Sequence, residues 1–175
     1  MNCLQKGYIH LYTGDGKGKT TAAIGLALRA CGSGLRVYIA QFTKGSDSGE
    51  VNALEKFFRA VTIHQFGARS FIKKKPTKID RILAAKGLAE VSAVIAAGRH
   101  DLVILDEICV ALRLRLFSVE QVLEILETRP ARVEIILTGR DAPQELIDAS
   151  DLVTEMREIR HYFKKGVRAR RGIEF

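Results

Sequence analysis

The stretch 13–21, "TGDGKGKTT", restricts the possible folds of this 175-residue chain more than any other segment. It follows the apolar run "YIHLYT" and precedes a stretch with helical spacing, so that a strand, a glycine-rich loop and a helix succeed one another. That order is the structural context of a phosphate-binding loop. We therefore predict an α/β fold in which backbone N–H groups of the loop surround an anion at the start of the helix.

The loop matches the pattern G-x-x-x-x-G-K-[ST] except at its first position, where Thr13 replaces glycine. A β-branched residue can end a strand without strain, so the physical prediction is unaffected. Lys19 is expected to contact phosphate oxygens and the Thr20 hydroxyl to bind Mg²⁺ or Mn²⁺. The alternative is a glycine-rich turn that binds nothing. The residues expected to bind the nucleotide are Gly14, Asp15, Gly16, Lys17, Gly18, Lys19, Thr20 and Thr21.

Short apolar runs alternate with helical patterns along the rest of the chain. Such alternation predicts parallel β-α-β units with right-handed crossovers, a mostly parallel sheet with helices on both faces, and one domain over residues 1–175. Expected strands cover 8–13, 36–42, 61–66, 101–107 and 133–140, with the last strand or strands within 151–159. Two expected helices cover 19–31 and 51–58, and a long third one follows Pro76. A fourth begins at a Ser118–Gln121 capping box, and the last carries Pro143 in its first turn.

The run "LVILDE" supports nucleotide binding because it ends in Asp106 and Glu107. A buried strand ending in a carboxylate resembles the second motif of nucleotide-binding proteins, and Glu107 is expected to hold the metal together with Thr20. Lys19, Thr20 and Glu107 are the expected catalytic residues. Arg140 ends another predicted strand and is expected near the same phosphates, because ligands gather at the carboxyl ends of strands; a surface arginine at a turn fits its position equally well.

Charge and cysteine content limit the class of protein. The net charge is +8, and residues 156–175 contain seven Lys/Arg against two Asp/Glu. This favours anionic partners, although a solvated basic surface is the alternative. Cys3, Cys31 and Cys109 form no CxxC pair, which is typical of reduced thiols in a cytoplasmic protein without structural zinc. No apolar run suits a membrane span or a secretory signal.

Several motifs together resemble one family, over about residues 7–175. They are the glycine loop, "QFTKG", "VILDE", "ILTGR" and the tail "DLVTEMREIRHYFKKGVRARRGIEF". The chain is similar to the ATP:corrinoid adenosyltransferases of the cobalamin pathway, also called cob(I)yrinic acid a,c-diamide adenosyltransferases. The resemblance implies a RecA-like P-loop NTPase fold and usually a homodimer. It also implies that a corrinoid is reduced to cob(I) by a flavoprotein or reduced flavin. The cobalt then takes the 5′-deoxyadenosyl group of ATP, and triphosphate leaves.

The resemblance also implies an aromatic cover over the corrin, in the loop after the third strand. Phe71 is the expected residue and Phe66 the second choice, with a plain core role as the alternative for Phe66. The chain has no Trp, although family members often pair two aromatics here. Asp15 replaces an Asn common in the family, and its charge is tolerable only if it points outward or touches metal or ribose. In the tail, Arg157, Arg160 and His161 are candidates to lie near the ligand.

Two other functions fit parts of the sequence. A RecA-like ATPase or small-molecule kinase would use Glu107 to orient water or an acceptor, but no acceptor or lid motif is visible. A nucleic-acid-binding module would use the basic clusters, but no helix-turn-helix, RNP or zinc pattern is present. Nucleic acid and membrane are therefore not expected as partners.

Overall fold

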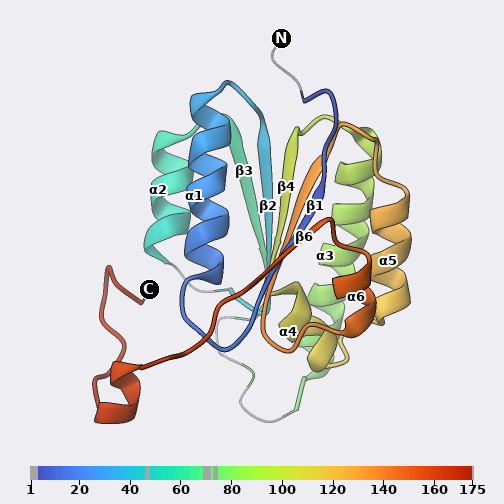
Figure 1. Ribbon diagram of the computed structural model, residues 1–175. Coiled ribbons are helices and arrows are strands. Elements are labelled where there is room, and N and C mark those ends of the chain that lie inside the picture. The colour runs from blue at the N-terminus through green and yellow to red at the C-terminus, as the bar shows by residue number, and fades with distance from the viewer. Residues whose placement is uncertain (1–3, 46–47, 69–71, 73–74, 175) are drawn as a thin grey trace.

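The computed structural model describes residues 4–45, 48–68, 72 and 75–174, whose six strands form one all-parallel sheet (Figure 1). The strand order is β3-β2-β4-β5-β1-β6. The sequence predicted every strand, with bounds that differ by a few residues at most. The strands are β1 (Ile9–Thr13), β2 (Val37–Phe42), β3 (Val61–Phe66), β4 (Leu102–Asp106), β5 (Glu134–Thr138) and β6 (Leu152–Glu155).

Helices cover both faces of the sheet, as predicted (Figure 1). One face carries α1 (Lys19–Gly32) and α2 (Gly49–Phe57), and the other carries α3 (Lys78–Ala97), α4 (Ile108–Arg113), α5 (Val119–Glu127) and α6 (Gln144–Asp148). Successive strand residues alternate between two hydrophobic clusters, one under each helical layer. The α/β fold with a parallel sheet is thereby confirmed, and it is consistent with a P-loop NTPase-like architecture.

Helix starts show which local signals the sequence carries. The Ser118–Gln121 capping box of α5 is present: the Ser118 hydroxyl accepts from the Gln121 N–H, and the Gln121 side chain accepts from the Ser118 N–H. Pro143 lies one residue earlier than predicted, as the cap of α6 with φ −65°, and not in its first turn. Helix α4 was not predicted, because six residues give too few turns for a periodic pattern.

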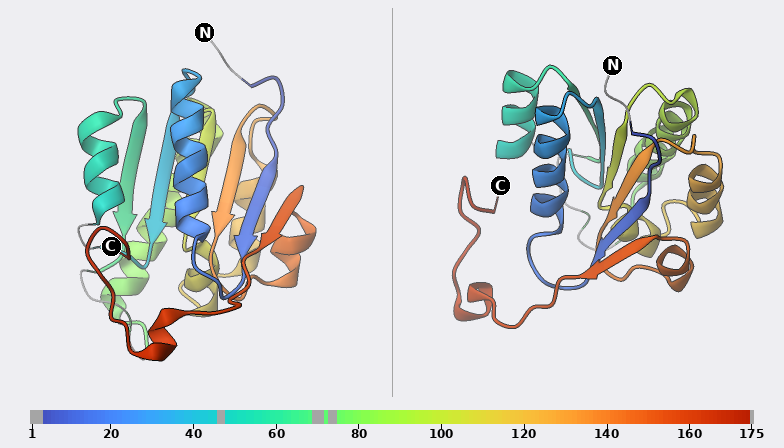
Figure 2. Two further views of the ribbon diagram at one scale, coloured as in Figure 1. Left: turned by 60° about the vertical axis from the view of Figure 1, so that its left-hand side comes forward. Right: turned by 45° about the horizontal axis from the view of Figure 1, so that its top comes forward.

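The carboxyl ends of the strands meet at one edge of the sheet, at the bottom of Figure 1. Strand β5 lies between β1 and β4, so it separates the strand before the glycine loop from the strand that ends in Asp106. After β6 the chain leaves the sheet, passes the glycine loop and forms a short 3₁₀ helix, Tyr162–Lys165 (Figure 2). This edge therefore brings together the loop, the carboxylates and the basic tail.

Two sequence expectations concern the chain as a whole. Among the described residues, no helix combines the length and apolar character that a membrane span requires. Cys31 and Cys109 are free thiols, and Cys3 lies outside the described residues.

Candidate active site

The glycine loop is shaped by close contact with the start of the tail. Gly14 and Gly18 have φ values of 92° and 120°, which favour glycine. The Gly16 N–H donates to the Met156 carbonyl at 2.6 Å. A Cβ added to Gly16 would lie 2.6 Å from that same carbonyl oxygen. Gly16 is therefore required by the backbone of the tail, in addition to any role it has toward a phosphate.

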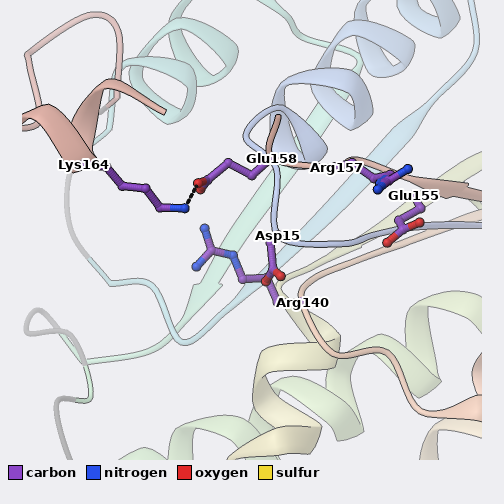
Figure 3. Close-up of a pocket in the computed structure, with 6 residues that line it drawn as sticks. All are labelled: Asp15, Arg140, Glu155, Arg157, Glu158 and Lys164. Carbon is purple, nitrogen blue, oxygen red and sulfur yellow. Dashed lines mark ion pairs between the residues drawn. The ribbon is translucent and has the colours of Figure 1, made fainter. Parts of the chain in front are cut away.

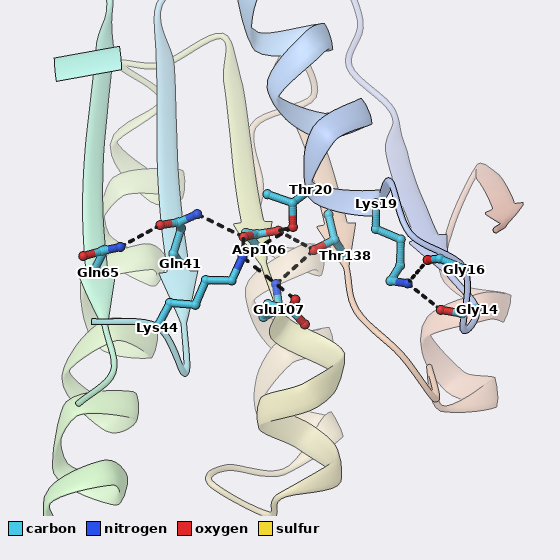
Figure 4. A network of polar contacts seen from close by, with 10 residues as sticks. All are labelled: Gly14, Gly16, Lys19, Thr20, Gln41, Lys44, Gln65, Asp106, Glu107 and Thr138. Carbon is cyan, nitrogen blue, oxygen red and sulfur yellow. Dashed lines mark hydrogen bonds and ion pairs between the residues drawn. The ribbon is translucent and has the colours of Figure 1, made fainter. Parts of the chain in front are cut away.

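Lys19 is buried inside the loop and points its ammonium at loop carbonyls. Its Nζ donates to the carbonyl oxygens of Gly14 at 2.5 Å and Gly16 at 2.7 Å (Figure 4). Burial lowers the pKa of Lys19, and the nearby Arg140 guanidinium adds to this. A bound anion would stabilise the charged form of Lys19, and the ammonium would then contact the anion in place of the two carbonyl oxygens.

Asp106, at the end of β4, connects four side chains from three neighbouring segments (Figure 4). Its carboxylate is 1% exposed. It accepts hydrogen bonds from Thr20 at 2.8 Å, Thr138 at 2.7 Å, Gln41 at 3.1 Å and the Lys44 ammonium at 3.0 Å. The Thr20 hydroxyl therefore donates a hydrogen bond directly to Asp106. The sequence analysis placed Asp106 at the strand end but gave it no role in the site.

Glu107 follows Asp106 but does not continue the strand, which corrects the predicted range of 101–107. Its φ and ψ are 61° and 24°, and it caps α4. Its N–H donates to the Thr138 hydroxyl at 2.9 Å. Burial and the adjacent Asp106 carboxylate raise the pKa of Glu107. A left-handed conformation is uncommon for a non-glycine residue, and it turns the side chain out of the strand beside Asp106.

Lys44 was missed by the sequence analysis, although it belongs to the quoted motif "QFTKG". It follows β2 and reaches the same cluster of oxygens. Its Nζ lies 3.0 Å from Asp106 Oδ2, 3.5 Å from Thr20 Oγ1 and 4.0 Å from Glu107 Oε1. Burial by itself would lower the pKa of Lys44, but the two carboxylates outweigh it and raise the pKa. Its place directly after a strand was the signal that could have identified it.

The donor set suits a magnesium ion that is shared with a substrate. Thr20, Asp106 and Glu107 offer a hydroxyl and two carboxylates, which are hard oxygen ligands. In the described part of the chain, no cluster of three His, Cys, Asp or Glu could by itself hold a metal. Mg²⁺ is commonly held by one or two carboxylates plus substrate phosphates, so these residues fit such an ion.

A charged cavity of about 400 Å³ adjoins the glycine loop (Figure 3). Arg140 and Asp15, two of the predicted binding residues, line it. Asp15 is exposed. The other lining residues come from the tail: Glu155, Arg157, Glu158 and Lys164, of which the last two form an ion pair.

The remaining predicted site residues take different positions. Thr21 is exposed on the first turn of α1. Lys17 turns toward the tail, where its ammonium contacts Tyr162, Glu174 and the Ile173 carbonyl. Phe66 is 5% exposed and packs against Phe42, which is a core position. Phe71 lies outside the described residues.

Comparison with known proteins finds one family. The family described as ATP:corrinoid adenosyltransferase BtuR/CobO/CobP matches residues 5–175. The corrinoid adenosyltransferase of Pseudomonas aeruginosa is 35% identical over 98% of this chain and 85% of its own length. That of a Sinorhizobium species is 37% identical over 98% and 81%. The corrinoid adenosyltransferase CobA of Salmonella typhimurium is 33% identical over 98% and 87%.

Proposed function

This chain belongs to the ATP:corrinoid adenosyltransferase family, and we propose that it transfers the 5′-deoxyadenosyl group of ATP to the cobalt of a cob(I) corrinoid, releasing triphosphate. One observation carries the proposal: Lys19 and Thr20, at the end of the glycine loop, lie at the same edge of the sheet as Asp106 and Glu107. That arrangement is suited to a nucleotide with its metal.

The glycine loop would bind the group that leaves. Backbone N–H groups of the loop and the start of α1 would attract negative charge, and Lys19 adds a point charge. The negative charge grows on the triphosphate as the bond at C5′ breaks, so contacts that strengthen with it lower the barrier. Arg140, exposed in the neighbouring cavity, can extend this positive field.

Thr20, Asp106 and Glu107 are the residues that would hold Mg²⁺ or Mn²⁺, directly or through water. When bound, the metal supplies further charge neutralisation of the phosphates. The hydrogen bonds from Thr138 and Gln41 hold the Asp106 carboxylate in place, so that its oxygens do not need to reorganise when the phosphates arrive.

The site does not need a side-chain base for this reaction. Cob(I) is itself a strong nucleophile, and no proton is removed when it attacks a carbon. Positioning of C5′ in line with cobalt supplies the remaining acceleration. Electrons for the corrinoid would come from a flavoprotein or reduced flavin, and we propose a cytoplasmic homodimer that serves adenosylcobalamin biosynthesis or salvage.

The products of a single incubation test the proposal. Purified protein is incubated without oxygen with ATP, Mg²⁺, a cobalamin or cobinamide and a strong reductant. The expected result is a light-sensitive adenosylcorrinoid and an equal amount of triphosphate. A Lys19→Met variant, with the phosphate contact removed, should lose most of this activity.

Other products would contradict the proposal. Release of ADP and phosphate without an adenosylcorrinoid would indicate an ATPase or a kinase. An adenosylcorrinoid formed with separate phosphate and diphosphate would leave the adenosyl transfer intact but would show that triphosphate is not the final product.

A further inference from the structure

The ammonium of Lys44 lies among the oxygens that the proposed function assigns to a divalent cation. Those oxygens come from three separate elements: Thr20 from α1, Asp106 from the end of β4 and Glu107 from the cap of α4. The Lys44 Nζ distances to them are 3.5, 3.0 and 4.0 Å (Figure 4). A single positive group therefore lies within 4.0 Å of two adjacent carboxylates and offsets part of their negative charge.

The backbone fixes the start of the Lys44 side chain. Thr43 has a φ of 59°, an uncommon conformation for a β-branched residue. A Cβ added to Gly67 would lie 2.4 Å from the Lys44 nitrogen, and one added to Gly45 would lie 2.1 Å from the Gly67 carbonyl oxygen. The turns after β2 and β3 are thus in direct backbone contact, which keeps Lys44 directed at the carboxylates.

Burial makes this charge balance important. The Lys44 side chain is 23% exposed, that of Glu107 24% and that of Asp106 1%. A buried carboxylate beside a second, partly exposed one is costly without a nearby cation. Within the part of the chain that the structure describes, the Lys44 ammonium pairs with both of them.

We propose that the Lys44 ammonium occupies the position of the divalent cation in the nucleotide-free enzyme, so that the metal enters with the phosphates of ATP and not before them. The inference rests on the proposed function, from which it takes the metal ligands. A metal ion that arrives alone must displace the Lys44 ammonium from the carboxylates. If both cations stayed, three positive charges would lie beside two negative ones. The phosphates of ATP add enough negative charge for both cations to remain.

Binding of Mn²⁺ to the free protein, followed by electron paramagnetic resonance, tests this directly. The proteins are the wild type, Lys44→Met, Lys44→Gln and a control, Lys86→Met, which removes an exposed lysine from α3. Without ATP, both Lys44 variants should bind Mn²⁺ at least about tenfold more tightly than the wild type, because the competing charge is gone. The control should match the wild type.

The wild-type protein offers a second measurement that does not depend on the folding of a variant. Mn²⁺ alone should leave its Tm unchanged, whereas Mn²⁺ with ATP should raise it. A rise with Mn²⁺ alone would overturn the Lys44 proposal, as would equal Mn²⁺ affinities of Lys44→Met and the wild type. In both cases tight binding of Mn²⁺ with ATP would leave the proposed function intact. If Mn²⁺ fails to bind even with ATP, the proposed metal site and the role of Lys44 are both wrong.

Discussion

Asp106 determines the arrangement of the polar side chains in the site. It is nearly inaccessible, yet it accepts hydrogen bonds from four side chains on three segments of the chain: Thr20, Gln41, Lys44 and Thr138. A buried carboxylate is costly unless its oxygens are paired, and here several donors supply the pairing. The same contacts place the Thr20 hydroxyl where a phosphate-bound metal is expected, so stability and function depend on one side chain.

An Asp106→Asn substitution should therefore destabilise the fold. The amide removes the negative charge that pairs with Lys44. It also places an NH₂ group, which is itself a donor, against the donating side chains of Thr20, Gln41 or Thr138. We expect a loss of about 3 kcal/mol, near the low end for a broken buried ion pair because Lys44 retains some exposure. Asp141→Asn, which breaks the exposed pair with Arg113, should cost less than about 1 kcal/mol. Urea denaturation compares the two, and equal losses would contradict the assigned importance of Asp106.

His100 should make the stability of the protein depend on pH. Its ring packs against Tyr38, and within the described residues its buried Nδ1 has no hydrogen-bond partner. Burial lowers the pKa of His100, and the charge of Arg36 adds to this, with Asp101 opposing. The folded state therefore binds a proton less readily than the unfolded state, and stability should decrease as the pH falls below about 6.5.

A His100→Asn variant tests this sign. The difference in unfolding free energy between wild type and variant should change between about pH 7 and pH 5, with the wild type losing more stability on acidification. Urea denaturation at several pH values gives the difference. A constant difference would show that the pKa of His100 is the same in the folded and unfolded states.

At the scale of elements, the glycine loop and the segment after β6 form one unit. Gly16→Ala should disturb it, because the new Cβ would lie 2.6 Å from the Met156 carbonyl oxygen. The expected cost is about 1–3 kcal/mol of stability, together with weaker ATP binding. Gly25→Ala is the matched control: nothing lies within 4 Å of its Cβ on α1, and helix propensity predicts a gain of about 1 kcal/mol. Thermal unfolding and calorimetric ATP titration measure both effects, and a Gly16→Ala variant that binds ATP normally would contradict the coupling.

The sequence was sufficient to predict the elements that depend on local patterns. Apolar runs and the glycine loop identified the strands and α1, and the Ser118–Gln121 pair identified the start of α5. Because the strands are parallel, their carboxyl ends had to meet at one edge, and this predicted that Thr20 and Glu107 would be close.

What the sequence did not reveal depends on long-range contacts. The strand was expected to include Glu107, but the chain turns there into α4, which is too short for a periodic signal. The contact of Lys44 with Asp106 requires β2 and β4 to be neighbours, and strand order is not encoded in any local pattern. The contact of the Lys17 ammonium with the tail likewise joins residues far apart in the sequence, and no local pattern indicated it.

At the scale of the whole molecule, the C-terminal tail contacts the glycine loop near the start of the sequence. The Lys17 ammonium lies 2.9 Å from Glu174 Oε1 and 3.1 Å from the Tyr162 hydroxyl. Glu174 also accepts from the Arg170 N–H at 2.7 Å, and the Arg170 guanidinium lies 4.9 Å from the centre of the Tyr162 ring. These contacts hold the pKa of Glu174 well below its usual range, with the Arg170 hydrogen bond as the largest cause. The basic tail is thus anchored on the loop by its own last acidic residue.

If this anchor positions the loop, Lys17 and Glu174 should act as a pair on nucleotide binding. We expect Glu174→Gln and Lys17→Met each to weaken ATP binding severalfold, and the double variant to bind no more weakly than the poorer single variant. Glu127→Gln, at the far end of α5, is the control for loss of one exposed acid. Calorimetric titration gives the affinities, and the rate of tryptic cleavage in the basic tail shows whether it has detached. Additive losses, or a tail that detaches without any loss of ATP affinity, would show that the anchor secures the tail but does not position the loop.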